Sequence, residues 1–384
     1  MRLYSIPLVR QNRLKYIPSL DGLRGIAVIS VILYHCFPFL VVTKIGWIGV
    51  DLFFVLSGFL ITGILYDTKS TPKYYVNFIL RRVLRIFPLY YFVLLLIFFV
   101  LPFFPSLVNW DFVYYRTHQA YFWSYMQNWL YSRDGFPKNH MLIHFWSLAV
   151  EEQFYIFWPW IVKLSPAKHL LKVTVILILV SVLFRLDLGF HFGYSIVYQY
   201  MATLSRMDAL LIGAAIAILI RNKPIWLEKA TVPILFVSFF VVAGTIVITG
   251  KVGFLSLPTI YTFIDLVCGC LLVFCLSSQQ VPILTGLVSN RILRWMGKYS
   301  YGLYVYHYII FNILEFKMRP FLSVTMGNEF FIGLIIGVFT LCLSLIVSYL
   351  SFRYLESPFL TLKKFFEYKV LETRNLHKLP SVLN

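Results

Sequence analysis

Long apolar runs separated by short polar segments make up most of the chain, from near Gly22 to about residue 350. A helix needs roughly 20 apolar residues to cross the hydrocarbon core of a bilayer. With windows of that length the pattern predicts ten membrane-spanning helices. They begin near Gly22, Trp47, Leu89, Ser147, His169, Ala202, Val232, Thr259, Tyr299 and Phe331. The predicted fold is an all-α integral membrane protein, a bundle of about ten transmembrane helices.

Two of the ten predicted spans fit the apolar pattern least well, because they contain charged residues. Asp51 lies in the outer part of the second span, and Arg206 and Asp208 open the sixth. An ionisable side chain costs about 3 kcal/mol at the bilayer centre on insertion scales, so it normally faces the bundle interior and marks a site. Because they are two residues apart, Arg206 and Asp208 are expected to bond to different helices.

Basic residues are unevenly distributed among the predicted loops. Placing both termini and the even-numbered loops in the cytoplasm puts 24 of the 34 Lys and Arg residues on that side. This is the asymmetry of the positive-inside rule, so both termini are predicted to be cytoplasmic. The connection from about Pro105 to Phe145 then lies outside, where its Trp, Tyr and His content indicates a lid or a short amphipathic helix.

Composition supports the membrane class, because 60% of the residues are hydrophobic and only 13% are charged. The net charge of +18 is spread over short loops, which argues against a nucleic-acid partner. The first apolar run has no small-residue cleavage site, so it is expected to stay as a span. Residues 1–360 are predicted to form one membrane domain, and residues 361–384 a short basic cytoplasmic tail. The five cysteines are expected to be buried thiols, without a metal site.

Arg24 and His35 are polar residues near opposite ends of the first span, "DGLRGIAVISVILYH". Eleven residues separate them, which leaves them about 20° apart on a helix face and roughly 16 Å apart along its axis. This spacing suits a long ligand with an anionic head and a reactive far end. The alternative is that Arg24 reaches lipid phosphates and His35 is an interfacial residue.

Asp51 falls in the same leaflet as His35 and could orient its imidazole, or it caps the start of the second helix. In "RRVLRIFP", Arg82 and Arg85 are three residues apart and share a helix face. They form either a phosphate clamp at the cytoplasmic surface or a patch that binds anionic lipid.

The fourth span, "IHFWSLAVEEQFYIFWPW", carries a polar stripe. The stripe consists of His144, Ser147, Glu151 and Tyr155. Glu152 and Gln153 are expected to turn away from it. An inward Glu151 would pair with an arginine or act as a base. In the ninth span Ser300, Tyr304 and His307 share a stripe, and the role of His307 stays open.

Together these segments resemble the acyltransferase-3 family of membrane O-acyltransferases, in the family's order. They are "DGLRGIAVISVILYH", "GVDLFFVLSGFLIT", "RRVLRIFP", "FWSLAVEEQFYIFWP", "RMDALLIGA", "GKYSYGLYVYH" and "LESPF". The resemblance covers roughly residues 15 to 360. It implies a stand-alone form, without the soluble esterase-like C-terminal domain of some members.

The resemblance implies transfer of an acyl group, most often acetyl, from cytoplasmic acyl-CoA to a hydroxyl of a surface glycan or lipid-linked sugar. It also implies a multi-pass protein of the bacterial inner membrane. The family has an arginine and a histidine separated by ten residues, and this element falls on Arg24 and His35. Its Arg-x-x-Arg element falls on Arg82 and Arg85. Its Trp-Ser-Leu-x-Val-Glu element includes Ser147 and Glu151.

The corresponding hypothesis places the coenzyme A phosphates on Arg24, Arg82 and Arg85. His35 acts as general base or transient acyl carrier, with Asp51 or Glu151 setting its tautomer. Candidate donors to the oxyanion are Ser147, Tyr304 or Trp146.

A transporter or flippase of a lipid-linked sugar is the alternative function, since it would also place charges inside a bundle. The sequence does not identify the acceptor glycan, the acyl length or the oligomeric state, and a homodimer stays open.

Overall fold

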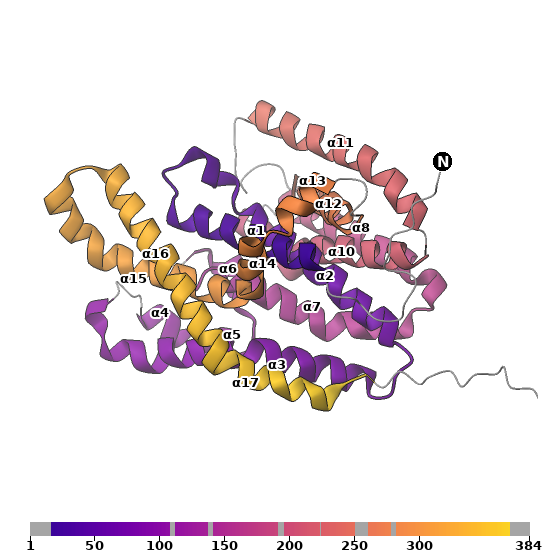
Figure 1. Cartoon of the computed structure of the whole chain (residues 1–384), viewed down its shortest axis with the longest axis horizontal. Coiled ribbons are helices and arrows are strands. Elements are labelled where there is room, and N and C mark those ends of the chain that lie inside the picture. The colour runs from indigo at the N-terminus through magenta and orange to yellow at the C-terminus, as the bar shows by residue number, and fades with distance from the viewer. Residues whose placement is uncertain are drawn as a thin grey trace, which may run out of the picture.

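The structure is a computed structural model that describes residues 17–107, 112–136, 141–190, 196–222, 224–249, 260–277 and 282–368. Within these ranges all regular elements are helical. Figure 1 shows the long helices α2, α3, α7 and α10 lying along the long axis of the molecule. The loop that joins α15 to α16 lies at one end of this axis, and the turn after α7 lies toward the other.

In the described part of the chain, ten helices of at least 17 residues overlap the ten predicted spans, although the third begins at Tyr74, well before the predicted start near Leu89. They are α1 (Pro18–Cys36), α2 (Ile48–Thr68), α3 (Tyr74–Leu95), α7 (Phe145–Leu164), α8 (Ala167–Phe190), α10 (Thr203–Asn222), α11 (Pro224–Thr249), α12 (Ile260–Leu276), α15 (Ser300–Met326) and α16 (Glu329–Ser351). Seven segments of the described chain are long and apolar enough to cross a membrane. The all-α membrane fold is thus confirmed, whereas the number of crossings and the side of the termini stay predictions.

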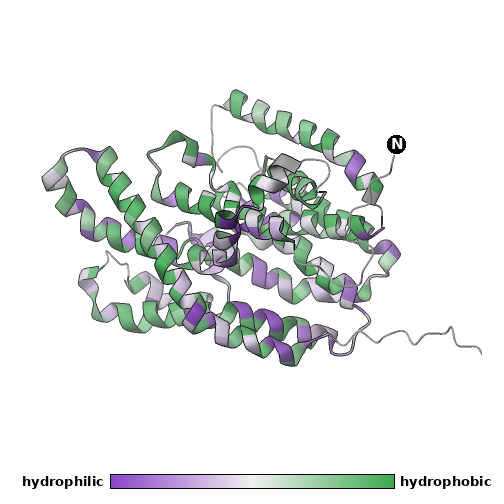
Figure 2. Ribbon diagram, viewed as in Figure 1, coloured by the Kyte–Doolittle hydropathy of each residue, from purple (hydrophilic) through white to green (hydrophobic). Residues whose placement is uncertain are grey.

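Shorter helical elements connect these long ones or follow the last of them, α16. They are η2 (Val41–Ile45), η3 (Leu96–Val100), η4 (Leu101–Phe103), η5 (Pro105–Leu107), α4 (Phe112–Thr117), α5 (Gln119–Trp123), α6 (Gln127–Asp134), α9 (Ile196–Met201), α13 (Pro282–Val288), α14 (Arg291–Lys298), η6 (Phe352–Glu356), α17 (Ser357–Thr361) and η7 (Leu362–Phe366). Figure 2 shows hydrophobic residues covering α11, α15 and α16, with hydrophilic residues gathered around α14 and along α3.

The centre of the bundle is the pair α2 and α10. The most apolar window of Ile196–Asn222 is 78% buried and that of Val41–Thr68 is 72% buried, against 11% for Ile225–Val247. A Cβ at Gly58 would lie 1.8 Å from the carbonyl oxygen of Leu210, so only glycine allows the two backbones to touch there. Such small-residue contacts are how membrane helices approach closely. Helix α11, in contrast, presents most of its surface to lipid.

The long connection folds over the bundle as short helices, as predicted for its described part. Tyr90 Oη on α3 donates to the carbonyl oxygen of Phe122 at 2.7 Å, and Gln127 Nε2 donates to that of Phe145 at 2.7 Å. These bonds join α5 and α6 to the ends of α3 and α7.

The cysteine prediction needs one correction. Four thiols are buried, on Cys36, Cys268, Cys270 and Cys275, but Cys342 on α16 is exposed. Its helix is apolar on several faces, so an apolar segment does not by itself imply burial in the bundle.

Candidate functional site

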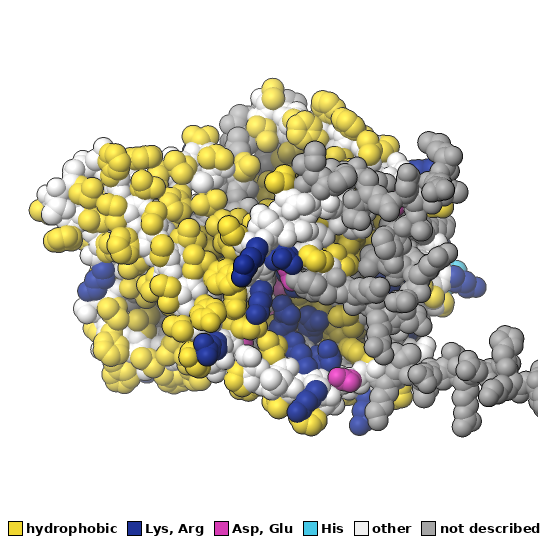
Figure 3. All heavy atoms as spheres, viewed as in Figure 1, with side chains coloured by type: hydrophobic (Ala, Val, Ile, Leu, Met, Phe, Trp, Pro, Cys, Tyr) yellow, Lys and Arg dark blue, Asp and Glu magenta, His cyan; other side chains and the backbone are white. Residues whose placement is uncertain are grey.

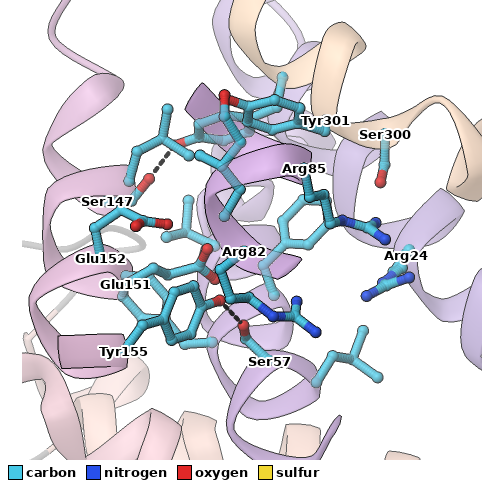
Figure 4. Close-up of a pocket in the computed structure, with 17 residues that line it drawn as sticks. Arg24, Ser57, Arg82, Arg85, Ser147, Glu151, Glu152, Tyr155, Ser300 and Tyr301 are labelled. Carbon is cyan, nitrogen blue, oxygen red and sulfur yellow. Dashed lines mark hydrogen bonds between the residues drawn. The ribbon is translucent and has the colours of Figure 1, made fainter. Parts of the chain in front are cut away.

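A pocket between α1, α2, α3, α7 and α15 brings together most of the predicted site residues (Figure 4). Arg24, Arg82, Arg85, Ser147 and Glu151 all line it. Its apolar wall consists of Val50, Phe53, Phe54, Leu56, Ile86 and Leu148. The pocket therefore has a basic part, an acidic part and an apolar wall, which suits an elongated amphipathic ligand.

The basic part is formed by two helices. Arg82 and Arg85 lie on one face of α3 because they are three residues apart, and Arg24 lies across from them on α1. Figure 4 shows the guanidinium groups of Arg82 and Arg85 directed toward Arg24. Asp21 lies 3.7 Å from Arg24, a loose ion pair for one of the three cations. Basic side chains also surround a hollow on the molecular surface over α14 and α3 (Figure 3).

Two adjacent carboxyl groups lie opposite the arginines, on α7. Both Glu151 and Glu152 line the pocket, so the expectation that Glu152 turns away is wrong. Successive helix residues are only 100° apart, and the pocket is wide enough to contact both. Glu152 Oε1 is buried without a hydrogen-bond partner. Gln153 does turn away, since its Nε2 donates to the carbonyl oxygen of Tyr125 at 2.7 Å.

A layer of two hydroxyl groups closes the pocket at Ser147 and Tyr304. Their oxygens are 2.5 Å apart. Both hydroxyls also lie within hydrogen-bond distance of the carbonyl oxygen of His144, Tyr304 Oη at 2.9 Å and Ser147 Oγ at 3.2 Å. The short contact between the two hydroxyl oxygens needs a hydrogen, so one hydroxyl donates to the other, which donates to His144, and both hydrogens are used. An oxyanion role for Ser147 would require this arrangement to change.

Three histidines lie beyond this layer, and His35 is one of them. His35 Nδ1 is 2.9 Å from His307 Nε2. The His144 ring packs edge-on against His307 at 5.2 Å between centroids. These residues come from α1, from the residue before α7, and from α15. His35 is not among the residues that line the pocket, so the structure separates the two polar ends of α1 into two adjoining sites.

Backbone carbonyls determine the tautomers of the His35 and His307 pair when both rings are neutral. His307 Nδ1 lies 2.7 Å from the carbonyl oxygen of Tyr304 and 3.1 Å from that of Leu303. A carbonyl oxygen only accepts, so His307 Nδ1 carries the proton and its Nε2 accepts. His35 Nδ1 must then donate to His307 Nε2. The consequence is that His35 Nε2 carries a lone pair, as a general base requires.

His144 differs from the other two histidines. Its Nε2 donates to the carbonyl oxygen of Val305 at 3.1 Å, while its Nδ1 is buried without a partner. Sequence reasoning placed His144 on the polar stripe of α7 and left His307 open. Neither pattern indicated that both would meet His35, because helix periodicity does not specify which helices are neighbours.

The structure corrects the partner that was predicted for Asp51. Its Oδ1 accepts from Arg206 Nη2 of α10, and both side chains are fully buried. His307, not Asp51, is the hydrogen-bond partner of His35. The guanidinium of Arg206 also lies 4.8 Å from the ring centroid of Tyr261. Asp51 therefore joins α2 to α10.

A second buried ion pair lies next to the first. Arg185 Nη2 is 2.8 Å from Asp208 Oδ2, and Thr262 Oγ1 donates to the same oxygen at 2.7 Å. The prediction that Arg206 and Asp208 bond to different helices is confirmed, since their partners lie on α2 and α8. Both oxygens of the nearby Asp265 are buried without a partner.

Comparison with known proteins identifies the family. Residues 17–352 match the protein family that is defined by an acyltransferase domain. The chain belongs to this family. It is 32% identical over 375 residues to the peptidoglycan O-acetyltransferase OatA of Listeria monocytogenes, covering 90% of this chain and 56% of the relative. No solved structure matches the chain.

Two further relatives carry similar names. The putative peptidoglycan O-acetyltransferase YrhL of Bacillus subtilis is 32% identical, over 90% of this chain and 55% of its own. A putative O-acetyltransferase of Staphylococcus aureus is 30% identical, over 91% of this chain and 58% of its own. This acyltransferase-family chain thus spans little more than half the length of these relatives. Among the described residues, no group of three or more His, Cys, Asp or Glu side chains is arranged to hold a metal ion.

The buried ion pair between Arg206 and Asp51 leads to a stability prediction for this member of the acyltransferase family. Arg206→Met should lower the free energy of unfolding by about 3–5 kcal/mol, because it leaves the Asp51 carboxylate buried without its counter-charge. Thermal unfolding in detergent measures the change. Adding Asp51→Asn to the same chain should restore part of the loss.

The matched control is Arg133→Ala, which removes the exposed arginine that pairs with Asp134 on α6. Exposed ion pairs contribute little, so this variant should unfold close to wild type. Equal unfolding temperatures for Arg206→Met and Arg133→Ala would show that the buried pair does not hold α2 and α10 together.

Proposed function

We propose that this protein is a membrane O-acyltransferase. It moves an acyl group, acetyl in the simplest case, from cytoplasmic acyl-CoA to a hydroxyl of a cell-surface polysaccharide or lipid-linked sugar. One observation carries the proposal: the arginine-lined pocket ends at the Ser147 and Tyr304 layer, and the three histidines lie directly behind it. The names of the relatives, two of which specify peptidoglycan, support acetyl transfer to a cell-wall glycan. The long apolar helices support a membrane location, for which we infer the bacterial cytoplasmic membrane.

The pocket fits the donor in charge and shape. Coenzyme A carries several phosphate charges at one end of a thin arm that ends in a thioester. Arg24, Arg82 and Arg85 would bind the phosphates through charge-assisted hydrogen bonds, which are about twice as strong as neutral ones. The apolar wall around Phe53 and Phe54 would contact the arm. Glu151 and Glu152 then balance the arginine charges when no donor is bound.

The chemistry requires a base at the far end of the arm. His35 Nε2 takes the proton of the acceptor hydroxyl, whose oxygen attacks the thioester carbonyl carbon. The carbon–sulfur bond breaks as the ester bond forms, and the thiolate leaves and takes up a proton. His307 acts as a positioning residue that holds His35 in the required tautomer. The thioester reaches His35 by displacing the hydrogen bond between Ser147 and Tyr304.

The deciding experiment measures transfer of a radiolabelled acetyl group from acetyl-CoA to a glycan. Purified protein, radiolabelled acetyl-CoA and cell-wall glycan are expected to give labelled glycan, and His35→Ala should lower the rate about 10²–10⁴-fold because it removes the general base. Undiminished transfer by His35→Ala would overturn the role of His35. Translocation of a lipid-linked sugar in vesicles, with no transfer from any acyl-CoA, would favour a flippase instead.

The arginines generate a separate prediction about binding. Arg82→Ala and Arg85→Ala should each weaken coenzyme A binding about 10–100-fold, since each removes charge-assisted hydrogen bonds to a phosphate. Calorimetry in detergent measures the dissociation constant, with Arg133→Ala as a control remote from the pocket. If the variants lose affinity for the glycan and keep affinity for coenzyme A, the phosphate-clamp assignment is wrong.

The positioning role of His307 can be separated from a purely structural one. His307→Ala should lower kcat about 10–100-fold with little change in KM for the donor, because the His35 imidazole is then free to adopt the unproductive tautomer. His307→Gln should recover part of kcat, since its amide oxygen can accept from His35 Nδ1. The pH profile of kcat should also shift in the alanine variant. Equal loss in both variants with an unchanged pH profile would contradict the tautomer argument.

A further inference from the structure

The chain continues in an ordered arrangement beyond residue 352, where the family match ends. Helix α17 and the 3₁₀ turn η7 lie beside α3, as Figure 1 shows. The sequence alone assigned residues after 360 to a basic tail. In the structure these residues return along the helix that supplies Arg82 and Arg85 to the pocket.

Specific hydrogen bonds hold this segment on α3. Arg81 Nη1 donates to the carbonyl oxygens of Lys363 at 3.1 Å and of Phe366 at 3.3 Å. Asn77 Nδ2, one helical turn earlier, donates to the carbonyl oxygen of Glu367 at 3.2 Å. The guanidinium of Arg81 also lies 5.7 Å from the ring centroid of Tyr368. These contacts satisfy carbonyl groups at the end of η7, which otherwise lack donors.

Neighbouring arginines on α3 therefore make different contacts. Arg81 binds the backbone of η7, whereas Arg82 and Arg85 line the pocket. At 100° per residue, Arg81 and Arg82 lie about 100° apart on α3, with Arg85 between them, about 40° from Arg81 and about 60° from Arg82. One helix thus fixes the returning segment next to the basic part of the pocket.

Lys363 is the residue of this segment that matters for the site. Its backbone carbonyl accepts from Arg81 at 3.1 Å, so Lys363 lies on the part of α3 that also carries Arg82 and Arg85. Its side chain is partly buried there, within reach of the charges of these three arginines. Glu356, on η6, is buried, accepts from Ser351 Oγ at 3.3 Å and lies within reach of the charge of Arg85. The adjoining Lys364 is exposed, and its Nζ lies 5.2 Å from the ring centroid of Phe365. Positive charges this close repel one another unless an anion lies between them.

We propose that Lys363 is a fourth cationic ligand of the donor site, and that α17 and η7 form a clamp that holds it beside Arg82 and Arg85. The ligand is then a polyphosphate such as the nucleotide end of coenzyme A, with about four negative charges, and not a single lipid phosphate. The inference rests on the proposed function, because it assigns a residue to that function's donor pocket.

Binding of coenzyme A to the detergent-solubilised full chain tests the proposal. Lys363→Ala should weaken binding about tenfold, as expected for loss of a charged contact to phosphate. Lys363→Arg should bind within about twofold of wild type because it keeps the charge. Lys364→Ala, the matched control, should also stay within about twofold. Arg81→Ala should weaken binding as well, since it releases the clamp.

The outcomes separate this inference from the proposed function. Wild-type protein that binds coenzyme A, together with Lys363→Ala of unchanged affinity, would overturn the clamp and leave the proposed donor intact. Equal losses in Lys363→Ala and Lys364→Ala would also overturn it, because the effect would then be one of net surface charge. Failure of wild-type protein to bind coenzyme A would overturn the donor assignment and the clamp with it. Recovery of affinity in Lys363→Arg guards against a folding defect in Lys363→Ala.

Discussion

Every arginine inside the bundle needs a counter-charge, because a lone cation in a low-dielectric interior is costly. The protein meets this need in two ways. Arg206 and Arg185 are fully buried and permanently paired with Asp51 and Asp208, so they join α10 to α2 and α8. Arg24, Arg82 and Arg85 instead converge on an open pocket, where the ion pair between Arg24 and Asp21 is loose, at 3.7 Å. The first set builds the bundle, and the second is available to an anionic ligand.

The histidine cluster shows how a helical backbone can set the chemistry of a side chain. Carbonyl oxygens of α15 fix the proton of His307, and through it the proton of His35. No carboxylate is needed for this arrangement. The same helix supplies Tyr304, whose hydroxyl lines the pocket next to Ser147, so α15 contributes both to the orientation of the proposed base and to the wall of the pocket.

Much of this arrangement follows from patterns within single helices. Hydropathy located the long helices, and spacing placed Arg82 with Arg85 and Ser147 with Glu151, all of which line one pocket. Contacts between different helices could not be predicted in the same way. Asp51 was assigned to His35 because both lie in one leaflet, but depth in the membrane does not determine which neighbour a side chain faces. The docking of η7 depends on backbone carbonyls that receive Arg81, and no pattern of side chains encodes that contact.

The central claim is that one path through the bundle leads from a donor on one side of the membrane to an acceptor on the other. Vesicles that contain purified protein in one orientation, with labelled acetyl-CoA on the cytoplasmic side alone and a membrane-impermeant glycan outside, test it directly. The account predicts labelled glycan outside, and none when Ser147 and Tyr304 are cross-linked through introduced cysteines. Transfer only when donor and acceptor share one compartment would contradict it.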